Sequence, residues 1–103
     1  RMSAALQVQS PDIRFVLKVT AGPNKGDIFR ITPPGLLIGR DSLTCKIALA
    51  DPRVSRQQCR IDFHPQGISI EDLSGKSTTL VNGTPLTKIH ELNRGDEIQM
   101  GDT

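Results

Sequence analysis

Apolar residues occupy every second position in several short segments of this chain, and turn-forming residues end each segment after a few positions. The first segment has apolar side chains at Ile13, Phe15, Leu17 and Val19. Because successive side chains of a β-strand point to opposite faces, this spacing predicts a strand with one buried face. The turn-forming stretch Gly22 to Gly26 follows, so we expect Asp27 to Ile31 to return as the second arm of a hairpin.

Two later regions show further strand and turn signals. From Gln57 to Phe63 the odd-numbered residues are predicted to face the core, and the even-numbered residues, Gln58 among them, to face solvent. Asn82 and Gly83 tolerate the positive φ angles of a type I′ turn, so they predict a tight hairpin. No segment has a helical pattern of useful length. The sequence therefore predicts an all-β fold, an antiparallel β-sandwich of about ten or eleven short strands.

The length of 103 residues fits one domain with a single core. We interpret residues 1–11 as an N-terminal tail that is flexible or adds a strand, because only Leu6 and Val8 alternate there. Residues 12–103 are interpreted as the β-sandwich domain.

Composition argues against several classes of partner. Thirteen Lys and Arg residues against eleven Asp and Glu residues give a net charge of +2, too small to indicate nucleic acid or an anionic membrane as the partner. Three Phe, no Tyr and no Trp leave few aromatic platforms on which bases could stack. No apolar run approaches the roughly 20 residues that span a bilayer, so we expect no membrane contact by this domain.

The two cysteines, Cys45 and Cys59, lack the spacing of a metal site or of a disulfide framework. We therefore expect no metal site and a reducing, cytoplasmic location. Cys59 is predicted to pack in the core, and Cys45 to be a loop thiol.

Motifs for catalysis are weak throughout the chain. The Gly-Lys-Ser tripeptide at residues 75–77 suggests a P-loop, but that motif needs a glycine where this chain has Ile70, and a helix where it predicts a strand. His64 and His90 belong to no recognisable nucleophile or metal motif. We therefore expect no enzymatic activity and no cofactor.

Three polar segments interrupt the predicted strands, at residues 39–42, 54–58 and 72–79. Loops at one end of a sandwich are displayed together, so donor groups from these segments can converge. The donors are Arg40, Ser55, Arg56, Lys76 and Ser77. A phosphate monoester has three acceptor oxygens and close to two negative charges, and a mixture of guanidinium, hydroxyl and ammonium groups suits it.

Four motifs, in order along the chain, resemble those of the forkhead-associated (FHA) domain family. They are Leu-Leu-Ile-Gly-Arg at 36–40, the segment 47–56 ending in Val-Ser-Arg, Leu-Val-Asn-Gly at 80–83, and Leu-Asn-Arg-Gly-Asp-Glu-Ile at 92–98. The resemblance implies a β-sandwich whose apical loops bind phosphothreonine in a partner protein and disfavour phosphoserine. It also implies that Arg40 and Ser55 hold the phosphate, with Arg56 and Lys76 as secondary contacts.

Two residues depart from the pattern of that family. Ser77 stands where the family usually has an asparagine that binds the peptide main chain, and Gln58 stands where it has a structural histidine. Asn82 matches a family asparagine and is interpreted first as a turn residue and second as a peptide contact. The departures leave an alternative open, a scaffold of the same fold that binds a partner or dimerises without phosphate.

The resemblance also raises a question about the last strand. Family members usually have one more apolar strand after the segment that ends at Ile98, and without it the first strand would be an exposed edge. We expect either that this strand is missing here, or that Leu6 to Gln9 fills the gap, within the chain or from a neighbour in a dimer.

Overall fold

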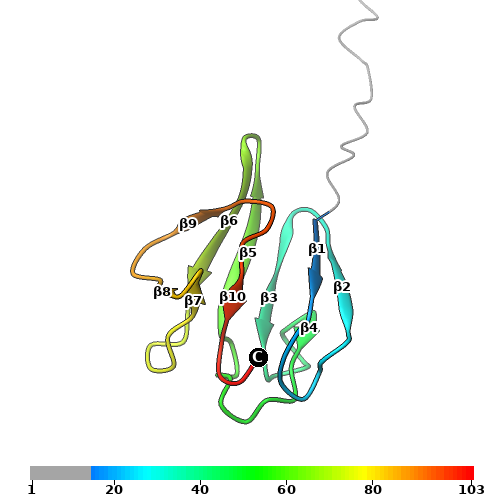
Figure 1. Cartoon of the computed structure of the whole chain (residues 1–103). Coiled ribbons are helices and arrows are strands. Elements are labelled where there is room, and N and C mark those ends of the chain that lie inside the picture. The colour runs from blue at the N-terminus through cyan, green and yellow to red at the C-terminus, as the bar shows by residue number, and fades with distance from the viewer. Residues whose placement is uncertain (1–14) are drawn as a thin grey trace, which may run out of the picture.

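The protein is built from two layers of short β-strands that pack face to face (Figure 1). The computed structural model describes residues 15–103. The strands are β1 (Phe15–Lys18), β2 (Ile28–Ile31), β3 (Gly35–Gly39), β4 (Ile47–Ala48), β5 (Cys59–His64), β6 (Gly67–Asp72), β7 (Leu80–Val81), β8 (Thr84–Pro85), β9 (His90–Leu92) and β10 (Ile98–Gln99). Ten strands and no helix in the described residues confirm the predicted all-β sandwich.

The strands pair within two layers. One layer is a five-stranded sheet with the order β4-β3-β5-β6-β9, and the other holds the β1-β2 hairpin and the three-stranded sheet β10-β7-β8. Every pair is antiparallel except β3 with β4, which run parallel over two residues. The predicted turn joins β7 to β8, with positive φ angles of 51° at Asn82 and 81° at Gly83. Residues with such φ angles match the right-handed twist of a two-residue hairpin.

Aliphatic side chains from both layers form the core. Alternation along β5 and β6 places Cys59, Ile61, Ile68 and Ile70 at 1% exposure or less. The rest of the buried cluster comes from residues Ile31, Ile38, Ile47, Leu49, Val54, Val81 and Met100. The predicted core position of Cys59 is confirmed, and the core fixes the strand ends from which the polar loops emerge.

The alternation predicted for residues 57–63 was wrong at its start. Gln57 is exposed and Gln58 is completely buried, because β5 begins only at Cys59 and the preceding residues belong to a loop. The Gln58 side chain is instead buried by its hydrogen bonds to neighbouring loops. Cys45 lies in the loop between β3 and β4, as predicted, and its thiol is buried there, where Sγ donates to the carbonyl oxygen of Arg56 over 3.2 Å.

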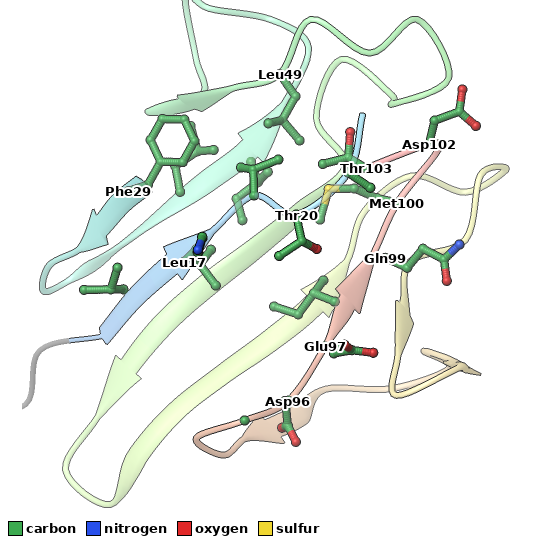
Figure 2. A pocket seen from close by; sticks show the side chains of 18 of the residues that line it. Leu17, Thr20, Phe29, Leu49, Asp96, Glu97, Gln99, Met100, Asp102 and Thr103 are labelled. Atoms are coloured by element: carbon green, nitrogen blue, oxygen red, sulfur yellow. The ribbon is translucent and has the colours of Figure 1, made fainter. Parts of the chain in front are cut away.

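A cleft of about 500 Å³ lies between β1 and β10 (Figure 2). Leu17 of β1 and Ile98 of β10 line it, and within residues 15–103 neither strand pairs with another on the side facing it. Met100 and Thr103 exchange two backbone hydrogen bonds, so the chain turns back beside the cleft at this point. That a further strand fills the gap stays a prediction, and the segment Leu6 to Gln9 lies outside the described residues. None of the six predicted site residues lines this cleft.

Candidate functional site

Three loops meet at one end of the sandwich, where β3 and β6 end and β5 begins (Figure 1). The backbone N–H of Arg40 donates to the carbonyl oxygen of Ser55 over 3.0 Å, and that of Leu73 donates to the carbonyl oxygen of Gln58 over 2.9 Å. These bonds tie the loop after β3 and the loop after β6 to the segment that precedes β5. The three polar segments of the sequence therefore converge.

Arg40 is exposed at the end of β3 and lies across the loop that carries Ser55. Its Nε donates to the carbonyl oxygen of Val54 over 3.0 Å. This bond fixes one edge of the guanidinium. The terminal Nη groups have no hydrogen bond or ion pair among residues 15–103, so their donors are not used within this part of the chain.

Ser55 and Ser77 come from different loops and stand side by side. Their Oγ atoms are 3.0 Å apart and hydrogen-bonded to each other, and both residues are half-buried. The structure thus joins three of the predicted site residues, Arg40, Ser55 and Ser77, in one group. A hydroxyl of such a pair can turn its proton toward an incoming acceptor, because hydroxyl hydrogens rotate.

Gln58 holds this hydroxyl pair in place from beneath. Its Oε1 accepts from the backbone N–H of Ser55 over 2.9 Å, while its Nε2 donates to the carbonyl oxygen of Ser77 and, over 3.0 Å, to Oγ1 of Thr79. A glutamine side chain carries one acceptor and two donors, and all of these functions are used here. Gln58 therefore links the two loops at the position where the family resemblance places a structural histidine.

Two further residues complete the support, and sequence analysis assigned a role to neither. Thr79 is completely buried, and its Oγ1 donates to Oδ1 of Asp72 over 2.7 Å. The same Asp72 oxygen accepts from the backbone N–H of Thr79 over 3.1 Å. Asp72 and Thr79 are the first and last residues of the third polar segment, and this position was the sequence signal that could have identified them. Their supporting role depends on a hydrogen bond between residues seven positions apart, which the sequence does not show.

Arg56 and Lys76 flank the hydroxyl pair in the sequence and are both exposed. Neither takes part in an ion pair within the described part of the chain. The carbonyl oxygen of Arg56 accepts from the backbone N–H of Asp41 over 3.1 Å, so its backbone is fixed while its side chain stays in solvent. These two cations add positive charge around the group without being held against it.

Asn82 is not joined to the other five predicted residues. Its Nδ2 donates to Oδ1 of Asp96 over 3.0 Å, and its Oδ1 accepts from the backbone N–H of Glu97 over 2.9 Å. Hydrogen bonds from the Asn93 backbone and from Asn82 hold the pKa of Asp96 below its ordinary value. The side chain of Asn82 thus ties the β7–β8 turn to the turn before β10.

Asp51 anchors the loop that leads to Ser55. Its side chain is completely buried and accepts from Arg53 N (2.9 Å), Asp102 N (2.7 Å) and Thr103 Oγ1 (2.8 Å). Burial by itself raises the pKa of this carboxyl, but the hydrogen bonds and the nearby Arg53 more than offset it, so the pKa lies below its ordinary value. These hydrogen bonds fix the position of Asp51, where the loop that leads to Ser55 begins.

Among residues 15–103, no group of three or more His, Cys, Asp or Glu side chains is placed to hold a metal ion. The same residues form no helix long and apolar enough to cross a membrane.

One end of this β-sandwich presents a guanidinium and two adjacent hydroxyl groups, which are donors of the kind that recognition modules use for anionic groups. The FHA domain family matches residues 36–101. The match covers more than half of the chain and includes all six predicted site residues. The chain therefore belongs to the FHA domain family.

Solved structures and a curated relative agree with this assignment. The FHA domain of CT664 from Chlamydia trachomatis matches with a TM-score of 0.79 and 30% identity, over 85% of this chain and 89% of that one. An FHA domain studied for phosphothreonine-dependent interactions matches with a TM-score of 0.74 and 26% identity, over 85% of this chain and 88% of that one. The human proliferation marker protein Ki-67 is 32% identical over 77 residues, which are 75% of this chain and 2% of that protein.

FHA domains are non-catalytic modules that bind phosphothreonine peptides of partner proteins. Because the chain spans about 2% of the length of its curated relative, nothing about the activity of that whole protein passes to this chain.

Proposed function

We propose that this domain binds a phosphorylated threonine of a partner protein and catalyses no reaction itself. The observation that carries the proposal is the joining of Arg40, Ser55 and Ser77, from three loops, into one hydrogen-bonded group. The phosphate takes charge-assisted hydrogen bonds from the Nη groups of Arg40, which have no partner among residues 15–103, and a hydrogen bond from the Ser55 hydroxyl. The match to an FHA domain with phosphothreonine-dependent interactions supports the same assignment.

The remaining predicted residues have graded roles in this proposal. Ser77, next to Ser55, supplies a second hydroxyl for the phosphate or for the peptide main chain. Arg56 and Lys76 attract the doubly charged phosphate at longer range, and salt screens this attraction. Asn82 contributes by shaping its turn, since its side chain is already hydrogen-bonded.

Acid should weaken binding for a reason that lies in the ligand. The second ionisation of a phosphothreonine has a pKa near 6, so the phosphate loses about one negative charge below that pH. The charge-assisted hydrogen bonds to Arg40 then weaken. We expect affinity to fall as the pH drops from about 7 to about 5.

The direct test is a titration of paired threonine peptides, phosphorylated and plain, against the wild type and Arg40→Ala. Loss of charge-assisted hydrogen bonds of about 1.5 to 3 kcal/mol corresponds to an affinity loss of about ten- to hundredfold. Arg40→Lys keeps the charge but removes the planar fork, so we expect it to restore only part of the affinity. Arg30→Ala is the matched control, because Arg30 is an exposed arginine on β2, outside the three loops.

The competing function is a scaffold that binds a partner or a second copy without phosphate. The observation that supports this alternative is that, within residues 15–103, β1 and β10 each have an edge that pairs with no other strand. Equal binding of plain and phosphorylated peptides, or an unchanged affinity in Arg40→Ala, would favour the scaffold and end the phosphothreonine proposal. A melting curve for each variant separates lost binding from lost folding.

A further inference from the structure

The loop between β4 and β5 carries Ser55, and a residue from another turn holds the first half of this loop. The backbone N–H of Ala50 donates to Oδ1 of Asn24 over 2.8 Å, although the two residues are 26 positions apart in the sequence. Asn24 belongs to the turn between β1 and β2, which lies beside the loop at the same end of the sandwich (Figure 1). This turn supplies none of the donors proposed for the phosphate.

The turn that carries Asn24 is itself fixed. The backbone N–H of Gly26 donates to the carbonyl oxygen of Val19 over 2.9 Å and so closes the turn. Asp27 orients the Asn24 amide, because its Oδ2 accepts from Nδ2 over 3.3 Å. An ionised carboxylate only accepts hydrogen bonds, so it meets the nitrogen of the amide and leaves the oxygen for Ala50. The acceptor is therefore held in place before any ligand arrives.

The residues after Ala50 connect this contact to both of the groups proposed to hold the phosphate. Asp51 is completely buried, and its carbonyl oxygen accepts from the backbone N–H of Val54 over 3.0 Å. The carbonyl oxygen of Val54 accepts from Nε of Arg40, and that of Ser55 accepts from the Arg40 backbone N–H. Closely packed groups transmit a displacement instead of absorbing it. The position of Ala50 therefore affects the position of Ser55 and the direction of the guanidinium.

The hydrogen bond between Asn24 and Ala50 lies at an exposed position. Water can therefore take the place of the Asn24 oxygen, and the net contribution of such a bond to stability is small. A bond that satisfies no buried group still has an effect on the loop, because it favours one position of the backbone over others. Its effect on binding can thus exceed its effect on folding.

We propose that Asn24 is a positioning residue for phosphate binding, whose side-chain oxygen holds the loop so that Arg40 and Ser55 face the same phosphate. This inference rests on the proposed function, because it takes the phosphate site as its end point. Asn24 does not contact the ligand and acts through Ala50. Holding both donors in place before binding removes the cost of ordering the loop in the complex, which raises affinity without a new contact.

Three variants separate the acceptor from the rest of the side chain. Asn24→Ala removes the acceptor. Asn24→Asp combined with Asp27→Asn reverses the pair, so that one carboxylate oxygen still accepts from Ala50, the other accepts from the amide at position 27, and the net charge is unchanged. Asn93→Ala is the matched control, because Asn93 is an exposed asparagine in another turn and its side chain makes no hydrogen bond among residues 15–103.

The probe is a phosphothreonine peptide selected from a library for binding to the wild type, with its plain-threonine copy. Affinity is measured by fluorescence polarisation at a temperature where the melting curve of each variant shows folded protein. We expect Asn24→Ala to bind the phosphopeptide about three- to tenfold more weakly than the wild type. The reversed pair and Asn93→Ala should both bind as the wild type does.

A double-mutant cycle with Ser55→Ala adds a readout that a purely structural role would not change. Because Asn24 acts by placing Ser55, Asn24→Ala should have a smaller effect once that hydroxyl is absent, whereas the effects of two independent losses would add. Full additivity, wild-type affinity in Asn24→Ala, or a folded reversed pair that stays weak overturns the inference and leaves the phosphate site standing. Equal binding of plain and phosphorylated peptides by the wild type instead refutes the proposed function, and this inference with it.

Discussion

Replacing Gln58 with alanine tests whether one buried amide holds the binding loops together. The change removes the partners of two polar groups, the Ser55 N–H and the Ser77 carbonyl, while Thr79 keeps its hydrogen bond to Asp72. Each polar group left unpaired in a buried position costs about 1 to 3 kcal/mol, and partial access of water lowers that cost. We expect Gln58→Ala to reduce the free energy of unfolding by about 2 to 4 kcal/mol.

A loss of this size is a large part of the free energy of unfolding of a small domain, which is typically about 5 to 15 kcal/mol. For a domain of roughly 100 residues it lowers the melting temperature by roughly 10 to 20 °C. Phosphopeptide affinity should fall too, because Ser55 and Ser77 lose their common support. Thermal unfolding followed by circular dichroism measures the first effect, and peptide titration the second.

Two companion variants make the test of Gln58 decisive. Gln57→Ala changes the adjacent exposed glutamine, so its melting temperature should match the wild type. Gln58→Glu keeps the shape but places an acceptor against the Ser77 carbonyl and buries a charge, both of which raise the pKa of the new carboxyl. With its folded-state pKa raised, this variant gains stability as the pH falls from 7 toward 5. A melting temperature of Gln58→Ala within two degrees or so of the wild type would refute the reasoning.

Three further predictions concern stability and reactivity. The pKa of Asp51 is lowered in the folded state, so its ionised carboxylate stabilises the fold at pH values above the ordinary pKa of 3.8, and this stabilisation is lost as the pH falls through the lowered pKa. Asp51→Asn should therefore reduce the free energy of unfolding by about 1 to 2 kcal/mol at pH 7. In urea unfolding, the difference between this variant and the wild type should shrink toward pH 2. Burial raises the pKa of the Cys59 thiol to about 12, so iodoacetamide at pH 8 should leave it unmodified in native protein and modify it on unfolding, as mass spectrometry would show. A Cβ at Gly39 would overlap the carbonyl oxygen of Arg56, so Gly39→Ala should displace that segment and weaken phosphopeptide binding, and affinity equal to the wild type would contradict this.

Much of the fold was predictable, because the residues that alternate as apolar in the sequence are those whose side chains face the core. Alternation along β1 and β5 gave the buried faces, and the Asn82-Gly83 pair gave a hairpin with the expected positive φ angles. Alternation failed at Gln58, where the chain is already a loop and burial follows hydrogen-bonding need rather than strand period. The burial of the loop residue Cys45 could not be predicted from a local pattern either, because its thiol is held by a contact eleven residues away.

The candidate site was predictable in part, because polar residues mark each of its loops at the end of a predicted strand. The polar segments with Arg40, Ser55 and Ser77 could be listed from the sequence, but the 3.0 Å approach of the two serine hydroxyls depends on the pairing of β3, β5 and β6. Asn82 shows the converse. Its motif match suggested a peptide contact, while its side chain is committed to a neighbouring turn, and only the fold distinguishes these roles.

The two departures from the family pattern belong to one hydrogen-bonded unit, which is why neither can be judged alone. Gln58 donates to the Ser77 carbonyl, and the Ser77 hydroxyl meets both Ser55 and, over 3.5 Å, the Gln58 Oε1. A glutamine amide offers a donor and an acceptor at once and does not titrate between pH 5 and 8, whereas an imidazole changes charge in that range. The support beneath Ser55 is therefore independent of pH in this chain. Any pH dependence of binding in that range then comes from the phosphate and from groups outside this unit, because glutamine stands where the family pattern has the titratable histidine.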